Sequence, residues 1–350
     1  MKQIQVLLAV LACFWSCRQA VGIQYENMPD VGTVFVSDDR ILNDTFMFGG
    51  PMDIFLVDSL IVVSDFQSHE YAFHVFGKSG THLCDFGRRG RGPGELVSVS
   101  SAKVSDGRIV AYDAGLKKII VYDLMDVMSG ERTYGQEYSL VGKTDNTVFQ
   151  TIPAAGDFIL AGNNDKMRFG VWNPDRSIPE CTYTGYPPFV SDDEVNWSIA
   201  NYAVSMEYSP DNAKLVTGTY IGCTLEMFDV DETEIRRDTV RYFYDFKEVG
   251  YAKGAVPKWV VPDGKTVIGF QDIVLTPDMV YGLIWGIELD DMEKGHQKII
   301  CFDYAGQPVC AYTMDDILVS FDIDDTGHIY GIAVTSDFSD YCIKVYPIDM

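Results

Sequence analysis

The sequence has few basic residues and, beyond residue 20, no long apolar run. Its 27 Lys and Arg residues face 51 Asp and Glu residues, which gives a formal net charge of −24. A surface this acidic repels phosphate backbones, so a nucleic-acid partner is excluded. The apolar runs beyond residue 20 fall short of the ~18 residues that a membrane-spanning helix needs. Membrane contact is therefore expected only through an N-terminal anchor.

Several catalytic signatures are also missing. The chain has no G-x-S-x-G elbow, no phosphate-binding G-x-x-x-x-G-K loop and no dinucleotide fingerprint. Disorder is excluded in turn, because hydrophobic residues make up 47% and aromatic residues 13% of the chain. The composition predicts a compact, acidic, aromatic-rich folded domain.

The first residues have the pattern of an export signal. Lys2 precedes an apolar stretch that ends at Ser16 and Cys17. The stretch resembles a bacterial lipobox, with Phe14 where the motif usually has Leu, and implies a lipid on Cys17. The alternative is ordinary signal cleavage a few residues later, with Cys17 removed or left free.

This interpretation divides the chain into three parts. Residues 1–16 are expected to be the signal peptide, 17–30 a tether, and 31–350 the folded domain. The tether begins without the acidic run that surface-exported lipoproteins often carry. The predicted location is therefore the outer membrane, facing the periplasm.

Internal repetition predicts the fold. A turn followed by an apolar strand recurs six times, at 57–65, 105–113, 154–163, 209–219, 276–286 and 324–334. A second strand with an aromatic residue follows each copy; these residues are Phe76, Tyr122, Trp172, Phe228, Phe302 and Tyr346. Six copies of one β-unit predict an all-β, six-bladed β-propeller. Two tandem sandwiches would not explain the repetition.

The last unit ends without its outermost strand. The segment Thr33–Ser37 or Ile41–Phe48 precedes the first unit and is free to supply it. We therefore predict that an N-terminal strand closes the last blade, which protects an open sheet edge.

Six cysteines follow Cys17, and one pair of them stands out. A two-residue turn at Ala305 and Gly306 would place Cys301 opposite Cys310 on neighbouring strands. Their Cβ atoms would be ~4.5–5.5 Å apart, slightly wide for a relaxed disulfide. A Cys301–Cys310 disulfide is one hypothesis, and packing of two small apolar side chains is the favoured alternative.

Two segments carry a family resemblance. Residues 74–96, HVFGKSGTHLCDFGRRGRGPGEL, resemble the fG-x-x-G-x-GPgE signature of TolB-like six-bladed propeller lipoproteins of Gram-negative bacteria. Residues 269–286 resemble a later blade segment of the same family. The resemblance implies a lipid-anchored propeller but carries over no catalytic residue. By analogy of fold with the scaffold that gives the family its name, it favours a binding role.

The loop of residues 87–95 contains the first candidate site. Arg88, Arg89 and Arg91 lie among glycines in a connection expected at the mouth of the central channel. Exposed backbone amides and arginine side chains suit an anion or an acidic partner. The favoured alternative is a tight turn in which arginine binds carbonyls and neighbouring acids.

A calcium site is the second candidate. Asp65, Asp113 and Asn163 follow equivalent strands of three consecutive units, and oxygen ligands of this kind hold Ca²⁺ in lactonase-like propellers. The favoured alternative is turn capping. The histidines do not predict zinc, because only His69 and His296 fall in loops at the predicted mouth and a third ligand is missing.

Trp197 and Trp285 lie near two insertions, 186–201 and 286–298, where they would stack on a sugar or anchor a partner, or else pack in the core. The sequence thus predicts a monomeric, lipid-anchored binding protein that recognises an envelope protein or glycan and needs no cofactor. Enzymatic activity is left open, and the alternative function is a calcium-dependent lactonase or lyase.

Overall fold

The structure is a computed structural model of the whole chain. It describes residues 26–28, 33–37, 40–43, 45–131, 134–143, 147–154, 157–164, 167–176, 181–183, 185, 204–231, 234–244, 250–251, 260–261, 264–335 and 340–348. No helix in this part of the chain is both long and apolar enough to cross a bilayer.

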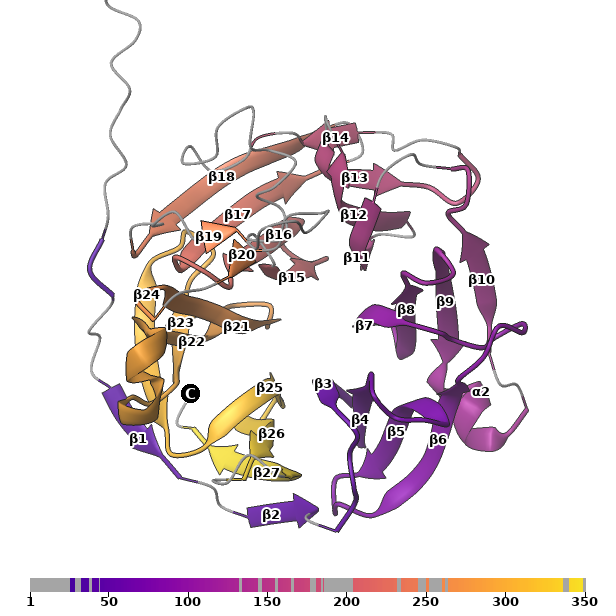
Figure 1. Ribbon diagram of the computed structural model, residues 1–350, viewed down its shortest axis with the longest axis horizontal. Helices are drawn as coiled ribbons and strands as arrows, with labels where there is room; N and C mark the ends of the chain where they lie inside the picture. Colours follow the sequence, from indigo (N-terminus) through magenta and orange to yellow (C-terminus); the bar gives the residue numbers. More distant parts are fainter. Residues whose placement is uncertain are drawn as a thin grey trace, which may run out of the picture.

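Six sheets, whose blade strands pair antiparallel, are arranged in a ring around a central axis (Figure 1). The first three blades are β3–β6 (Pro51–Val57, Leu60–Asp65, Tyr71–Gly77, His82–Arg88), β7–β10 (Val99–Ser105, Arg108–Asp113, Lys118–Asp123, Gln136–Ser139) and β11–β14 (Thr147–Ala154, Asp157–Asn164, Met167–Trp172, Cys181–Tyr183). The last three are β15–β18 (Val204–Ser209, Lys214–Thr219, Thr224–Val230, Ile235–Tyr242), β21–β24 (Val267–Leu275, Val280–Glu288, Lys298–Phe302, Pro308–Met314) and β25–β27 (Ile317–Ile323, His328–Val334, Tyr341–Pro347).

The chain runs outward through each blade, so the first strand of every blade lies nearest the axis (Figure 1). This arrangement confirms the predicted six-bladed propeller. Small elements decorate it: the helix α2 (Leu124–Ser129), the 3₁₀ helix η1 (Leu289–Lys294), and the two-stranded sheet of β19 (Gly250–Tyr251) and β20 (Val260–Val261).

The predicted N-terminal closure of the last blade is confirmed. Strand β2 (Arg40–Asn43) pairs antiparallel with β27 and supplies the missing outermost strand. Of the two segments proposed, the one around residue 41 does this. The other has a different partner: β1 (Thr33–Val36) pairs parallel with β24 and adds a fifth strand to the neighbouring blade.

The hydrophobic core consists of layers between neighbouring blades. Each of the described core clusters combines residues of two adjacent sheets. The six repeated aromatic residues lie on the third strands and are at most 1% exposed. Full burial of such a side chain contributes ~1.5–3 kcal/mol. The repeat therefore exists because every blade must present a large apolar side chain to its neighbour.

The hairpin between the last two strands has the same irregularity in the first and fifth blades. In the fifth blade Phe302 pairs with Pro308 and Cys301 with Cys310, so Val309 is an extra residue. The predicted two-residue turn was wrong, because Asp303 N–H donates to Gln307 O at 2.9 Å and closes a loop one residue longer. The bulge at Val309 compensates for that residue and restores the predicted Cys301–Cys310 register.

Candidate functional site

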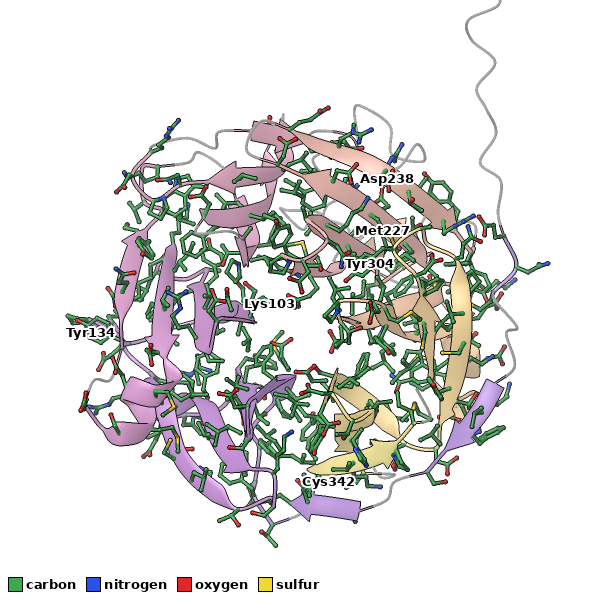
Figure 2. The ribbon with its side chains drawn as sticks, turned by 180° about the vertical axis from the view of Figure 1, so that it is seen from behind. Lys103, Tyr134, Met227, Asp238, Tyr304 and Cys342 are labelled. Atoms are coloured by element: carbon green, nitrogen blue, oxygen red, sulfur yellow. The ribbon has the colours of Figure 1, made fainter. Side chains whose placement is uncertain are left out.

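The innermost strands place charged side chains around the channel axis. Asp53 comes from β3, Lys103 from β7, Glu207 from β15, Asp272 from β21 and Asp322 from β25. Figure 2 shows Lys103 beside the central opening. Five blades thus contribute one ammonium group and four carboxyl groups to the lining of a central cavity.

Two cavities occupy the channel and meet at its middle. A cavity of about 280 Å³ is lined by residues near the beginnings of the innermost strands, including Ser100 and Gln271. A second of about 240 Å³ is lined by residues toward the ends of these strands. Asp53, Lys103 and Asp272 line both cavities, so a charged constriction separates the two ends of the channel.

Lys103 holds the constriction together. Its Nζ lies 2.7 Å from Glu207 Oε2, and its side chain is only 10% exposed. Burial opposes the ammonium charge, but attraction by Glu207, Asp272 and Asp53 outweighs burial and raises the Lys103 pKa. The lysine is therefore a permanent cation within an acidic ring.

Burial acts on the acids in the opposite sense. It raises the pKa of Asp53 to about 6 and that of Asp322 to about 7, because a buried carboxylate loses its hydration. It also raises the pKa of Asp272, although Lys103 and hydrogen bonds from Ser320 and Phe321 oppose the shift. Carboxyl groups poised near neutrality in a cavity are typical of a binding or catalytic site.

The cavity of about 280 Å³ also contains polar atoms without partners. Ser100 Oγ and Gln271 Nε2 are buried and make no hydrogen bond to any described group. Buried polar atoms usually have a hydrogen-bond partner, and a buried atom without one lowers the stability of the fold by ~1–3 kcal/mol. They offer a hydroxyl and an amide donor to a polar ligand that enters this end of the channel.

Sequence reasoning missed the channel site because it searched the loops for function. The available signal was a charged residue within the strand that precedes five of the six predicted turns, as in SMEYS around Glu207 and FQDIV around Asp272. Only the closed ring shows that these positions face one axis.

The arginine loop has a divided role. Arg89 is partly buried, and its guanidinium donates to the carbonyls of Asp65 and Phe66 at 2.8 Å and of Ser68 at 3.2 Å. Arg88 and Arg91 are exposed, with no ion pair to an acid in the described part of the chain. Arg89 thus has the contacts of a turn-fixing residue, whereas Arg88 and Arg91 are available to a ligand.

Two carboxylates, one from the loop and one from β10, accept hydrogen bonds from two of the loop's glycine amides. Gly92 N–H donates to Glu95 Oε2 at 2.8 Å, and Gly94 N–H donates to Glu137 Oε1. Tyr122, on β9, donates to Gly94 O at 3.0 Å and fixes the loop against the second blade. An anion at this loop would therefore depend on the exposed arginines rather than on these two amides.

Asp65 and Asp113 bind backbone amides in equivalent ways. Each ends the second strand of its blade and accepts hydrogen bonds from the residues that lead into the first strand. The donors to Asp65 are the amides of Gly49, Gly50, Gln67 and Ser68 at 2.6–3.2 Å. The donors to Asp113 are those of Val97, Ser98 and Leu116 at 2.5–3.3 Å.

These contacts are the capping pattern that the sequence offered as the alternative to calcium. Burial opposes ionisation of Asp65, but attraction by His74 and hydrogen bonds from the amides of Gly49 and Gly50 outweigh it and lower the pKa of Asp65. The side chain of Asn163 lies outside the described residues. The calcium site stays a prediction without support from the two aspartates that the structure describes.

The other predicted site residues are scattered. Trp285 is 5% exposed and lines a cavity of about 440 Å³ with Phe35 and His296, away from the channel. Cys301 and Cys310 face each other as free thiols. Cys17 and Trp197 lie outside the described residues.

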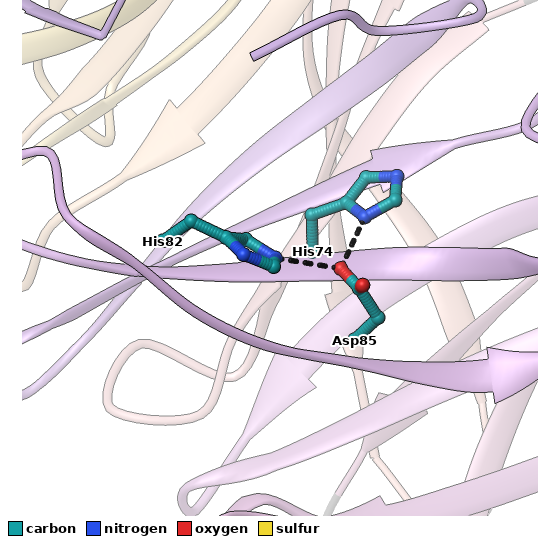
Figure 3. Close-up of side chains that lie close together, drawn as sticks. All are labelled: His74, His82 and Asp85. Carbon is teal, nitrogen blue, oxygen red and sulfur yellow. Dashed lines mark hydrogen bonds and ion pairs between the residues drawn. The ribbon is translucent and has the colours of Figure 1, made fainter.

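The structure brings together one cluster that sequence reasoning set aside. His74 Nδ1 and His82 Nε2 lie 2.6 and 2.7 Å from the same carboxylate oxygen of Asp85 (Figure 3). His74 comes from β5, and the other two come from β6. The bulge at Leu83 pairs His82 with Phe76 and so turns His82 toward Asp85.

The six sheets around a channel define a six-bladed β-propeller. Residues 32–326 match the family described as TolB-like 6-blade propeller-like. The chain belongs to this family. Membership fits a binding or scaffold role.

Solved structures share the fold at low identity. One is a Bacteroides fragilis protein described as exported, with 12% identity, a TM-score of 0.56, and coverage of 93% of this chain and 98% of that chain. Another is a DUF4221 family member from Bacteroides vulgatus, with 11% identity, a TM-score of 0.56, and coverage of 91% and 99%. No curated protein sequence matches this chain.

Proposed function

We propose that this chain is an exported, lipid-anchored binding protein that recognises a protein or glycan of the cell envelope at one end of its propeller channel. The observation that carries the proposal is the cavity of about 280 Å³, with the unpartnered Ser100 Oγ and Gln271 Nε2 above a charged constriction. Its volume is near the lower end of the ~300–1,000 Å³ typical of small-ligand sites. It suits one sugar ring or one polar side chain of a larger partner.

The arginine loop supports recognition at the same end of the channel. The loop ends at Glu95, four residues before β7, and the early β7 residues Ser100 and Ser101 line this cavity. Arg88 and Arg91 are exposed on that loop. In a chain of net charge −24, two exposed arginines on this loop favour an acidic group on the partner.

Location is the second part of the proposal. The similarity to a protein described as exported and the signal-like first residues both support export. Growth with a labelled fatty acid tests the anchor. The native chain should incorporate the label and Cys17→Ser should not, whereas equal labelling of both would refute lipidation at this residue.

Crosslinking in intact cells, followed by affinity capture, tests recognition. Arg88→Ala/Arg91→Ala should lose the partner that the native chain captures. Arg108→Ala/Arg236→Ala is the matched control, because it removes the same charge from exposed positions away from this loop. Equal capture by both double variants would refute a role for the loop.

The cavity needs its own variant. Ser100→Ala/Gln271→Ala should abolish capture without lowering the melting temperature, because the Ser100 hydroxyl and the Gln271 Nε2 amide have no partner in the free protein. Capture that is unaffected by this change would show that the cavity is not the binding site. Digestion of the captured material with a protease or a glycosidase then distinguishes a protein from a glycan.

A further inference from the structure

We propose that His74, His82 and Asp85 form a binding site for a divalent transition-metal ion such as Zn²⁺ on the outer half of the first blade. The potential ligand atoms of the three side chains lie within 4.8 Å of one another. In the described part of the chain this is the only such group of three among His, Cys, Asp and Glu. Imidazole and carboxylate are ligands that Zn²⁺ accepts.

The spacing is close to that of a metal-bound cluster. Tetrahedral Zn²⁺ with bonds of ~2.0–2.2 Å separates neighbouring ligand atoms by about 3.4 Å. The two histidine nitrogens are now 2.6 and 2.7 Å from Asp85 Oδ1. An opening of roughly 0.7 Å is needed to admit the ion. The side chains of His82 and Asp85 are 33% and 29% exposed, so they have room to move.

His74 has the environment of an oriented metal ligand. Its side chain is 5% exposed, and its Nε2 faces Asp65 Oδ2 at 3.7 Å. This nitrogen is buried and lacks a partner at hydrogen-bond distance among the described groups. A metal-ligating histidine usually directs its second nitrogen at a carboxylate, which fixes the ring. Asp65 is itself held by the amides of Gly49 and Gly50, so the second shell is rigid.

Phe46 forms one wall of the site. Its ring centroid is 4.7 Å from that of His74 and 4.9 Å from that of His82. This residue follows β2, the strand that closes the last blade. The partial exposure of His82 and Asp85 leaves an open side for a water molecule or an external donor as fourth ligand. An ion here would crosslink β5 to β6 of the first blade. The site lies next to Phe46, in the segment that follows the closing strand β2.

Metal binding to the chelator-treated, full-length mature chain tests the proposal. Zn²⁺ should bind with one-to-one stoichiometry by titration calorimetry and should raise the melting temperature, because a ligand of the native state stabilises it. Co²⁺ should give a visible d–d absorption band. His82→Ala and Asp85→Asn should each remove the calorimetric signal, the melting shift and the band.

The matched control is His69→Ala, which changes an exposed histidine of the same blade outside the cluster. It should bind Zn²⁺ like the native chain. Asp85→Asn keeps the shape of the side chain, so its metal-free melting temperature separates loss of a ligand from loss of fold. Absence of Zn²⁺ binding by the native chain, or undiminished binding by both cluster variants, would overturn the proposal and leave a hydrogen-bonded His–Asp–His cluster.

Discussion

Cys84 and Cys310 occupy equivalent positions on two blades, but they face different residues. Cys84 lies opposite Val75, whereas Cys310 lies opposite Cys301. Burial raises the pKa of the Cys84 thiol, and the nearby Asp85 adds to the shift. A hydrogen bond with Cys301 instead lowers the pKa of Cys310 to about 6, against the effect of burial. One hairpin geometry thus produces two thiols of opposite character.

This difference predicts selective alkylation. At pH 7 Cys310 should react with iodoacetamide faster than Cys84, because the thiolate is the reactive form and both residues are partly buried. Peptide mass spectrometry over time measures both rates in one sample. Cys301→Val should slow Cys310 toward the rate of Cys84. If Cys310 reacts only after a reductant is added, the Cys301–Cys310 disulfide hypothesis gains support instead.

The arginine loop predicts a contrast in stability. Arg89→Ala should lower the free energy of unfolding by about 1–3 kcal/mol, because three carbonyls lose a charged donor. Arg88→Ala changes an exposed side chain and should stay within about 0.5 kcal/mol of the native chain. Urea denaturation of the two variants provides the comparison. Equal effects would contradict the divided role of the loop.

Asp113 predicts a calcium-independent loss of stability. Asp113→Asn should lower the free energy of unfolding by about 1–3 kcal/mol, since one oxygen that accepts backbone N–H groups becomes a donor. The loss should be the same in Ca²⁺ and in a calcium chelator. A melting temperature of the native chain that rises with Ca²⁺, and ceases to do so in Asp113→Asn, would favour the lactonase or lyase alternative.

The channel acids predict an unusual dependence on pH. An unfolded Asp has a pKa of ~3.9, whereas Asp53 in the folded chain has a pKa of about 6. Between these values the folded state binds more protons than the unfolded state, so Asp53 makes stability fall as pH rises from about 4 to 6.

Asp53→Asn should remove the fall in stability that Asp53 causes between about pH 4 and 6. The Asn side-chain oxygen can still accept the hydrogen bond from Ser64, so this contact is kept. Urea midpoints of both chains, measured in steps from pH 4 to 7, give the difference curve. If the urea midpoints of the two chains change with pH in parallel, folding does not shift the pKa of Asp53. If the stability of the native chain instead rises relative to that of the variant as pH rises, the pKa of Asp53 is lowered by folding rather than raised.

The sequence predicted the ring because its repetition has a direct physical cause. Trp172 and Tyr346 stand at the same place in their units since each fills a layer between two blades. The closing strand was predictable for a similar reason, because a last blade without its outermost strand leaves an edge to be covered.

The sites were harder to predict because they depend on which way a side chain points. Asp272 faces the channel only because its strand is innermost in a closed ring. His82 joins Asp85 only because one extra residue, Leu83, shifts the register. Alternation along the strand would have put Leu83 opposite Phe76. Neither the inward position of Asp272 nor the bulge at Leu83 is visible in a local pattern.

The N-terminal segment touches the last three blades in turn. Glu26 N–H donates to Tyr242 O on the fourth blade at 2.8 Å, β1 pairs with β24 on the fifth, and β2 completes the sixth. A force applied to the residues before Glu26 therefore acts on three hydrogen-bonded contacts one after another. The first two must be broken before load reaches the strand that closes the ring. The segment therefore shields the closing strand from force, and a pull at its N-terminal end does not act directly on the pairing of β2 with β27.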